Sequence, residues 1–129
     1  MAYLSLISVF GGAGFGACLR WWLGARLNPL LPSLPLGTLA ANLIGGLLIG
    51  GFAAYFSHHT ALAPELRLLV ITGFLGGLTT FSTFSLEVVT LLMRGQIALA
   101  AGAASVHLVG SLALTGLGIS LVQLLLRAR

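Results

Sequence analysis

The sequence has very few charged residues. It contains no lysine, six arginines and two glutamates among 129 residues, so charged side chains make up 6% of the chain while hydrophobic ones make up 58%. A water-soluble domain has about a quarter of its residues charged. The composition therefore excludes an ordinary soluble domain and predicts an integral membrane protein, in agreement with the mean hydropathy of +1.10.

Cysteine is also nearly absent. Cys18 stands alone, which excludes an intramolecular disulfide, and we expect it to be a free, buried and unreactive thiol. The sequence has no cluster of Cys or His with metal-site spacing, and no nucleophile–base pair or carboxylate pair suggests catalysis, so we expect no enzymatic activity. The arginines lie near the ends of hydrophobic stretches rather than in one stripe, which argues against a nucleic-acid partner.

Four hydrophobic stretches are long enough to cross a bilayer, which requires about 20 apolar residues per helix. We place these spans at about residues 3–23, 36–56, 66–92 and 97–126. No basic residue precedes the first span, so it lacks the charged start of a signal peptide and we expect it to remain in the mature protein. The sequence thus predicts an all-α, multi-pass membrane protein with a single membrane domain over residues 1–129.

The arginines are balanced between the two faces of such a bundle. With four spans, both termini share one face. Three arginines then lie on each face: Arg67, Arg127 and Arg129 on that of the termini, and Arg20, Arg26 and Arg94 on the other. Because the positive-inside rule depends on an excess of Lys and Arg on one face, it predicts no preferred orientation for this chain. Either both orientations are made, which permits an antiparallel two-fold dimer, or another signal such as the free amino terminus decides.

Glycine is abundant, with 18 residues, and pairs spaced four apart occur in the first three spans. These pairs are Gly12/Gly16, Gly46/Gly50 and Gly73/Gly77. Such spacing lets two helix backbones approach closely in lipid. We therefore expect these glycines to lie at helix–helix contacts.

The third span contains the most unusual segment, Gly76-Gly-Leu-Thr-Thr-Phe-Ser-Thr-Phe-Ser85. Lipid cannot satisfy so many hydroxyl groups, so they must be buried in protein or line a polar path. Gly76 and Gly77, followed by two threonines, can unwind the helix and free carbonyl oxygens for a cation. The alternative is a continuous helix in which the hydroxyls bond back to carbonyls one turn earlier.

Phe81 and Phe84 alternate with the hydroxyl residues at helical spacing. The edge of an aromatic ring is its positive part, so two edges among Ser and Thr donors can line a path for a small anion. The alternative is an ordinary lipid-facing or core position. Asn42, the polar residue in the middle of the second span, either donates to an anion from its NH₂ group or forms an interhelical hydrogen bond.

Four further polar residues have more than one interpretation. Arg20, which two tryptophans follow, is either an interfacial anchor or a cation that draws anions into a vestibule. Ser111 lies one turn after His107 and would face the same polar path, whereas we expect His107 to be a packing residue rather than a proton carrier. Glu87, the one acid within a span, caps the path, pairs with an arginine or reaches the interface.

The residues together resemble the Fluc/CrcB family of fluoride channels. The segment from Gly76 to Glu87 carries the resemblance, together with Arg20-Trp21, Gly37-Thr38-Leu-Ala-Ala-Asn42 and Gly110-Ser111, and it extends over all four spans. The resemblance implies four transmembrane helices with a break in the third and an antiparallel, dual-topology homodimer in the inner membrane. It also implies passive export of cytoplasmic fluoride through two antiparallel pores.

The resemblance further implies roles for individual residues. The pore and vestibule positions of the family correspond to Asn42, Phe81, Phe84, Ser82, Thr83, Ser111 and Arg20. The backbone carbonyls of Gly76 and Thr79 would bind a structural sodium ion on the two-fold axis of the dimer. Fluoride is small and strongly hydrated, so its pore must replace water with many donors without trapping the ion.

Two other functions remain as alternatives. A small four-helix, proton-coupled multidrug exporter needs a central acid within the membrane, but the first span has none and Glu87 lies late in the third. A non-transporting assembly subunit would need no file of polar residues through its core.

Overall fold

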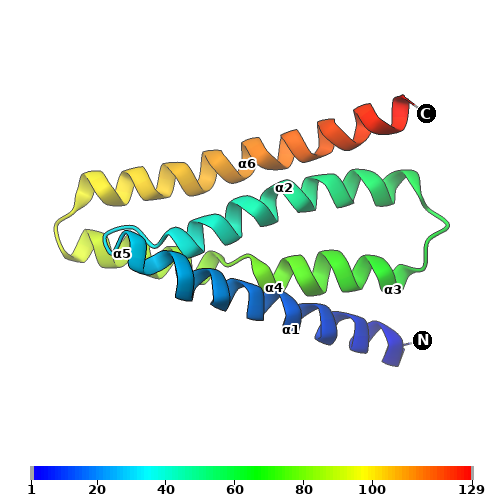
Figure 1. Ribbon diagram of the computed structural model, residues 1–129, viewed down its shortest axis with the longest axis horizontal. Helices are drawn as coiled ribbons and strands as arrows, with labels where there is room; N and C mark the ends of the chain where they lie inside the picture. Colours follow the sequence, from blue (N-terminus) through cyan, green and yellow to red (C-terminus); the bar gives the residue numbers. More distant parts are fainter. Residues whose placement is uncertain (1, 129) are drawn as a thin grey trace.

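Four long helical segments, running alternately up and down, form the fold in the computed structural model, which describes residues 2–128 (Figure 1). Each is long and apolar enough to cross a membrane: Ala2–Leu30, Leu36–His58, Pro64–Met93 and Ile97–Arg127. The predicted all-α fold and its four membrane spans are therefore confirmed. Both termini lie at the same end of the bundle as the connection between the second and third spans (Figure 1).

The first two spans are joined by a proline-rich connection. Helix α1 (Ala2–Leu27) runs into a short 3₁₀ turn, η1 (Asn28–Leu30), and α2 (Leu36–His58) follows. Oδ1 of Asn28 accepts a hydrogen bond of 2.8 Å from the backbone N–H of Gly37. A free N–H in the first turn of α2 is thereby satisfied from the end of α1, which fixes the two helices relative to each other.

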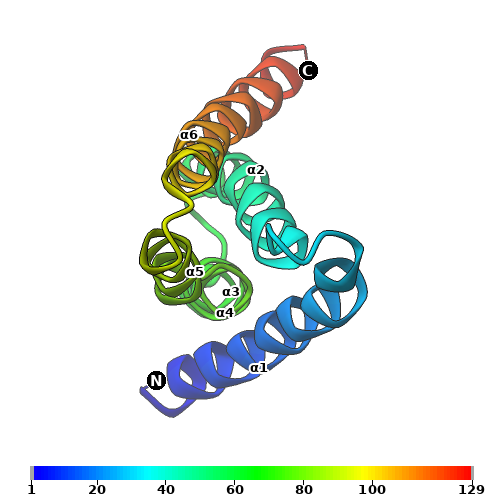
Figure 2. The ribbon, with the colours of Figure 1, turned by 90° about the vertical axis from the view of Figure 1, so that its left-hand side faces the viewer.

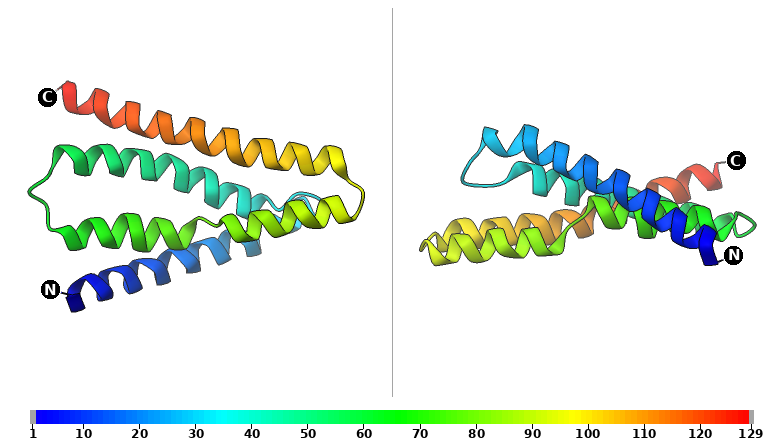
Figure 3. Two further views of the ribbon diagram at one scale, coloured as in Figure 1. Left: turned by 180° about the vertical axis from the view of Figure 1, so that it is seen from behind. Right: turned by 90° about the horizontal axis from the view of Figure 1, so that it is seen from below.

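The third span consists of four segments: α3 (Pro64–Arg67), the π-helical η2 (Leu68–Leu75), α4 (Gly76–Leu78) and α5 (Phe81–Met93). Between α4 and α5 the backbone is extended, with φ −81° and ψ 156° at Thr79 and φ −151° and ψ 119° at Thr80. The ribbon straightens visibly at this point in both views of Figure 3. The helix thus ends after Leu78, and the glycine pair at residues 76 and 77 stays helical.

A tight turn leads into the last helix, α6 (Ile97–Arg127). The N–H of Gly95 bonds to the carbonyl of Leu92 and that of Gln96 to the carbonyl of Leu91, each at 2.9 Å. This is a Schellman motif, and it requires the positive φ of 73° that Gly95 adopts. The turn therefore returns the chain sharply alongside α5.

Helix packing occurs mainly in two pairs, α1 with η2 and α2 with α6, as Figure 2 shows end-on. At the first contact, a Cβ added at Gly12 would overlap the carbonyl oxygen of Leu69, and one added at Gly16 would overlap that of Phe74. In return, a Cβ on Gly77 would overlap the carbonyl oxygen of Ala13. The expected close contact is confirmed, and it explains why Gly77 stays helical.

The α2–α6 contact uses the same device. A Cβ added at Gly50 would overlap the carbonyl oxygen of Thr115, and one at Gly118 would overlap that of Leu47. A Cβ at Gly46 would lie 3.0 Å from the carbonyl oxygen of Ser111. Small residues thus bring backbone against backbone at both main contacts.

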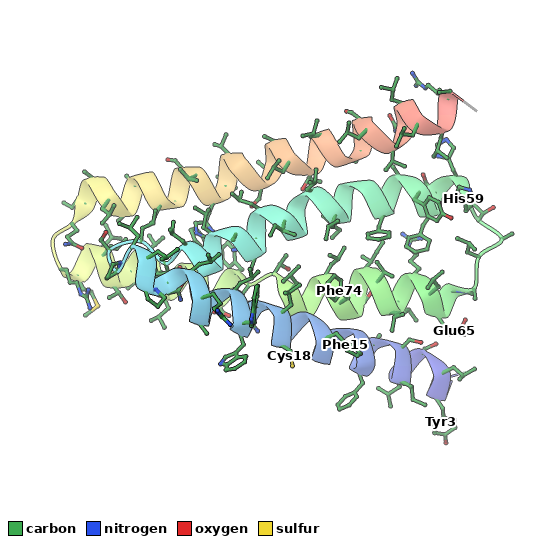
Figure 4. The ribbon with its side chains drawn as sticks, viewed as in Figure 1. Tyr3, Phe15, Cys18, His59, Glu65 and Phe74 are labelled. Atoms are coloured by element: carbon green, nitrogen blue, oxygen red, sulfur yellow. The ribbon has the colours of Figure 1, made fainter. Side chains whose placement is uncertain are left out.

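Cys18 corrects one expectation from the sequence. Its thiol is free, as expected, but it is exposed rather than buried. Position 18 lies two residues after Gly16, on the opposite side of α1 from the glycine contact. Figure 4 shows Cys18, Phe15 and Tyr3 projecting from the outer side of α1. In lipid an apolar side chain gains nothing from burial, so hydrophobic character did not indicate which side faces protein.

The described arginines are divided between the two ends of the bundle. Arg67 and Arg127 lie at the end that holds the termini, whereas Arg26 and Arg94 lie at the other, where α1 and α5 end (Figure 1). Arg20 is in the last third of α1. Arg129, the remaining arginine of the balance, lies outside the described residues.

Candidate functional site

The extended segment between α4 and α5 is held by the side chain of Asn42 on α2. Oδ1 of Asn42 accepts a hydrogen bond of 2.8 Å from the N–H of Thr80, and Nδ2 donates one of 3.0 Å to the carbonyl oxygen of Thr80. The amide thus pairs with both polar groups of one residue, as a neighbouring strand would. The bond to Oδ1 satisfies the N–H of Thr80, which has no helical partner where the helix is interrupted.

His107 on α6 completes this group. Its Nδ1 lies 3.2 Å from Nδ2 of Asn42, and its ring packs on that of Phe84 with centroids 4.6 Å apart. The ring is buried, with 6% of the residue exposed. His107 thus packs in the interior, as expected, and it also contacts Asn42, the side chain that holds the backbone of Thr80.

Hydroxyl groups at the start of α5 form a network of their own. The hydroxyl of Thr80 accepts from the N–H of Thr83 at 3.1 Å and donates to Oγ1 of Thr83 at 3.0 Å. Oγ of Ser82 lies 3.3 Å from the same Thr80 oxygen. Thr80 therefore caps α5 with its side chain while Asn42 holds its backbone.

A cavity of about 350 Å³ opens beside this group, between α2, α5 and α6. The two phenylalanine rings meet there edge-on, with centroids 5.5 Å apart and an interplanar angle of 60°. Phe81 is 80% exposed. The polar residues lining the cavity are Asn42, Thr79, Thr80, His107, Ser111 and Thr115. An apolar cavity with ring edges and a few donors is suited to a small desolvated ligand.

A second, more polar cavity of about 270 Å³ is lined by residues of α1, α2 and α5. Its lining includes Arg20, Thr38, Thr83 and again Thr80, which is shared by both cavities. Nε of Arg20 donates a hydrogen bond of 3.1 Å to the carbonyl oxygen of Gly77. The guanidinium group thus places positive charge next to the end of α4, in a cavity that would attract an anion.

The acid of the third span takes part in a single interhelical bond. Oγ1 of Thr38, which is buried in α2, donates to Oε1 of Glu87 in α5 at 2.5 Å. This distance is at the short end of the range for a hydrogen bond from a hydroxyl group to an oxygen atom. Of the three interpretations of Glu87, none named a hydroxyl partner on α2.

The hydroxyls of the third span serve two different purposes. Those of Thr79 and Ser85 donate to carbonyl oxygens one turn earlier, of Leu75 and Phe81, each at 2.8 Å. The back-bonding alternative therefore applies to these residues, although the helix is interrupted. Thr80 and Thr83 instead bond to each other across the start of α5.

The predicted site residues lie at two cavities rather than one, and one of them lies at neither. Those on the first cavity are Asn42, Phe81, Phe84 and Ser111, and those on the second are Arg20 and Thr83. Ser82 is exposed and lines neither of these two cavities. Sequence reasoning gave no separate role to Thr80, Thr38 or Thr115. The signal for Thr115 was its position one turn after Ser111 on the same side of α6.

Comparison with known proteins gives a consistent result. Residues 7–119 match the family described as CrcB-like protein, Camphor Resistance (CrcB). A protein of Nitrosospira multiformis is 59% identical over 95% of this chain and 96% of its own length. One of Pseudomonas paraeruginosa is 59% identical over 89% of this chain and 91% of its length, and one of Burkholderia mallei is 57% identical over 90% and 91%.

All three relatives bear the name fluoride-specific ion channel FluC. The family match reaches all four membrane spans, the first and last in part, and includes every residue that lines the two cavities. By these matches the chain belongs to the CrcB family of membrane proteins.

Proposed function

We propose that this protein is a fluoride-selective ion channel. The observation that carries the proposal is the cavity beside the interrupted third helix, which is lined by two phenylalanine rings together with hydroxyl, amide and imidazole groups. Relatives that are up to 59% identical over most of the chain are named as fluoride-specific channels. These names agree with the expectation that the chain is not an enzyme.

The cavity would act by replacing the water around fluoride with protein groups. Phe81 and Phe84 offer the positive edges of their rings, and Ser111 offers a hydroxyl. Arg20 in the second cavity would raise the local concentration of anions, with Thr83 beside it. Ser82, which is exposed at the start of α5, would continue the row of hydroxyls. Many weak partners of this kind bind an ion well enough to admit it and loosely enough to release it.

The functional unit in this proposal is an antiparallel homodimer with two pores, inserted in both orientations in the inner membrane. Its support is the division of the described arginines between the two ends of the bundle. Fluoride would leave the cytoplasm passively, down its own gradient. In this arrangement each copy supplies one set of the cavity residues.

A sodium ion would join the two copies on their two-fold axis. The carbonyls of Gly76 and Thr79 fit such a role, because they flank the point where α4 ends and the extended backbone of Thr79 turns away from helical bonding. Neutral oxygens suit a hard cation, and the ion would supply structural cross-linking only. We expect the dimer to unfold at a lower temperature when sodium is replaced by a large organic cation.

The deciding experiment for the function uses purified protein in liposomes. Vesicles loaded with fluoride should release it within seconds to minutes when an added ionophore lets a cation leave with it, so that no charge accumulates. Vesicles loaded with chloride should not release their anion. Equal release of both anions would contradict selectivity. Release of neither would favour the assembly-subunit alternative, and proton-driven uptake of a cationic dye would favour the multidrug exporter, although no central acid in α1 supports that alternative.

The dimer is tested separately by fixing the orientation of the chain. Removing arginines from one end of the bundle, as in Arg26→Gln with Arg94→Gln, should force one orientation and abolish fluoride release. Co-expression with the opposite variant, Arg67→Gln with Arg127→Gln, should restore it. Full activity from one orientation alone would refute the antiparallel dimer but leave the channel proposal standing.

A further inference from the structure

Asn42 has no amide hydrogen left for a ligand. The N–H of Thr80 can only donate and its carbonyl can only accept, so these two bonds fix which end of the amide is oxygen. One hydrogen of Nδ2 is bonded to the carbonyl of Thr80. The other is directed to Nδ1 of His107, at 3.2 Å. Both donors of the amide are therefore engaged by the protein.

This assignment also determines the state of the His107 ring. Since Nδ2 of Asn42 is a donor, Nδ1 of His107 must accept, which places the ring proton on Nε2 and leaves the ring neutral. The other tautomer, or the doubly protonated ring, would set two donors against each other. The ring cannot turn away easily, because it is buried and packed on Phe84.

We propose that His107 is a positioning residue for permeation: as the Nε2–H tautomer it orients the Asn42 amide, which in turn holds the Thr80 peptide between the two cavities. The proposal rests on the proposed channel function. It assigns Asn42 the task of holding the interrupted backbone instead of donating directly to the anion.

Thr80 is the point at which this arrangement affects conduction. It lines both the cavity of the phenylalanines and the cavity of Arg20. Its hydroxyl also caps α5, the helix that carries Phe81 and Phe84. A displaced Thr80 would therefore change the wall of both cavities and the start of the helix that positions both rings.

Three substitutions at His107 separate its features. His107→Asn keeps an acceptor, Oδ1, at the position of Nδ1 but loses the ring. His107→Gln moves its polar atoms one bond further out, to the position of Nε2, and His107→Phe keeps the ring without any acceptor. All three are reconstituted in liposomes and compared in fluoride release, with elution volume in detergent as the measure of folding.

We expect His107→Asn to retain release within about threefold of the parent and His107→Phe to lose about tenfold, the equivalent of one buried hydrogen bond. His107→Gln should resemble His107→Phe. If Gln restores release and Asn does not, the outer nitrogen is the functional one and the proposal is wrong. If Phe releases fluoride like the parent, the ring serves packing alone and the proposal is equally wrong.

A spectroscopic measurement tests the tautomer without any flux. In a His58→Gln, His59→Gln background, ¹⁵N magnetic resonance of the one remaining histidine should show a protonated Nε2 and an unprotonated Nδ1. Asn42→Leu should then shift the Nδ1 resonance. A protonated Nδ1 in the parent would overturn the proposal. If the parent released no fluoride, the proposed function would fail, but this measurement would still decide how His107 holds Asn42.

Discussion

The two halves of the third span, before and after Thr79–Thr80, differ in what they contact and in what they demand of a side chain. The first half, from α3 to α4, presses its backbone against the glycines of α1, and Gly73 and Gly77 leave no room for a Cβ. The second half, α5, contributes two aromatic rings to one cavity and the hydroxyl residue Thr83 to the other. In the first half, the space available limits which side chains fit. In the second half, the chemical groups of the side chains matter because they line the cavities.

The difference explains why the interruption lies where it does. Up to Leu78 the helix is fixed by contact with α1, and beyond Phe81 it follows α6. Between them, the side chain of Asn42 holds the extended backbone at Thr80, and Arg20 bonds to the carbonyl of Gly77 in the last turn before it. The protein thus changes from close packing to hydrogen bonding within two residues.

The largest effect should come from adding one carbon to the contact of the first half. Gly16→Ala places a Cβ against the carbonyl of Phe74, where backbone must move, and we expect the free energy of unfolding to fall by about 3 kcal/mol. Gly14→Ala on the same helix meets nothing within 4 Å and should leave stability unchanged or slightly higher. Thermal unfolding in detergent compares them. Equal unfolding temperatures for the two variants would show that volume does not govern this half.

The next effect concerns the rings of the second half. Phe81→Ile and Phe84→Ile keep most of the apolar volume but lose the ring edge, so each should lower fluoride release about tenfold, or about 1.4 kcal/mol, while the protein stays folded. Phe10→Ile and Phe52→Ile, away from the first cavity, should change release little. Normal release from the Phe81→Ile, Phe84→Ile double variant would mean that the rings are only scaffold.

A smaller effect is expected at the bond that ties α5 to α2. Thr38→Val keeps the shape of the side chain but leaves the Glu87 carboxylate without its donor, which should cost about 1 kcal/mol of stability. The single variant Glu87→Met, which has no acceptor oxygen, and the Thr38→Val, Glu87→Met double variant complete a thermodynamic cycle. Additive losses in that cycle would mean that the two side chains do not interact. Thr90→Val, whose hydroxyl bonds within its own helix, is the matched control.

The smallest effect should come from a hydroxyl that serves only its own helix. Ser85→Ala removes a bond back to the carbonyl of Phe81, and we expect fluoride release to stay within about twofold of the parent. Thr83→Val, which breaks the cap of α5, should lower release more. If Ser85→Ala lowered fluoride release more than Thr83→Val, the hydroxyl groups would act as ligands for the ion whatever hydrogen bonds they form within the protein.

The parts of the fold that could be predicted from sequence depend on local properties. The four spans follow from runs of apolar residues, and the close contacts of Gly12, Gly16 and Gly77 follow from a spacing of four on one helix. Composition alone could not say which side of α1 faces protein. The expectation for Cys18 was wrong for this reason, since lipid and protein interior are equally apolar.

The candidate site could be predicted only by residue type, because its bonds join distant parts of the chain. Asn42 and Thr80 are 38 residues apart, Thr38 and Glu87 are 49, and Arg20 and Gly77 are 57. Such pairs depend on how the helices are arranged, which no local pattern contains. Asn42 was recognisable as a polar residue in the middle of a membrane span, but its partners were not. The sequence likewise indicated unwinding by the glycine pair and the two threonines that follow, but not that the glycines themselves stay helical.

The bonds around Thr80 also imply an order of events during synthesis. Asn42 lies in the second span and Thr80 in the third, whereas His107 lies in the last. A chain made from its amino terminus can pair the first two residues as soon as the third span enters the membrane. The asparagine amide gains its third partner only when α6 is inserted. All these bonds form within one polypeptide, so a single chain holds the ends of its interrupted third helix without bonds from any other molecule.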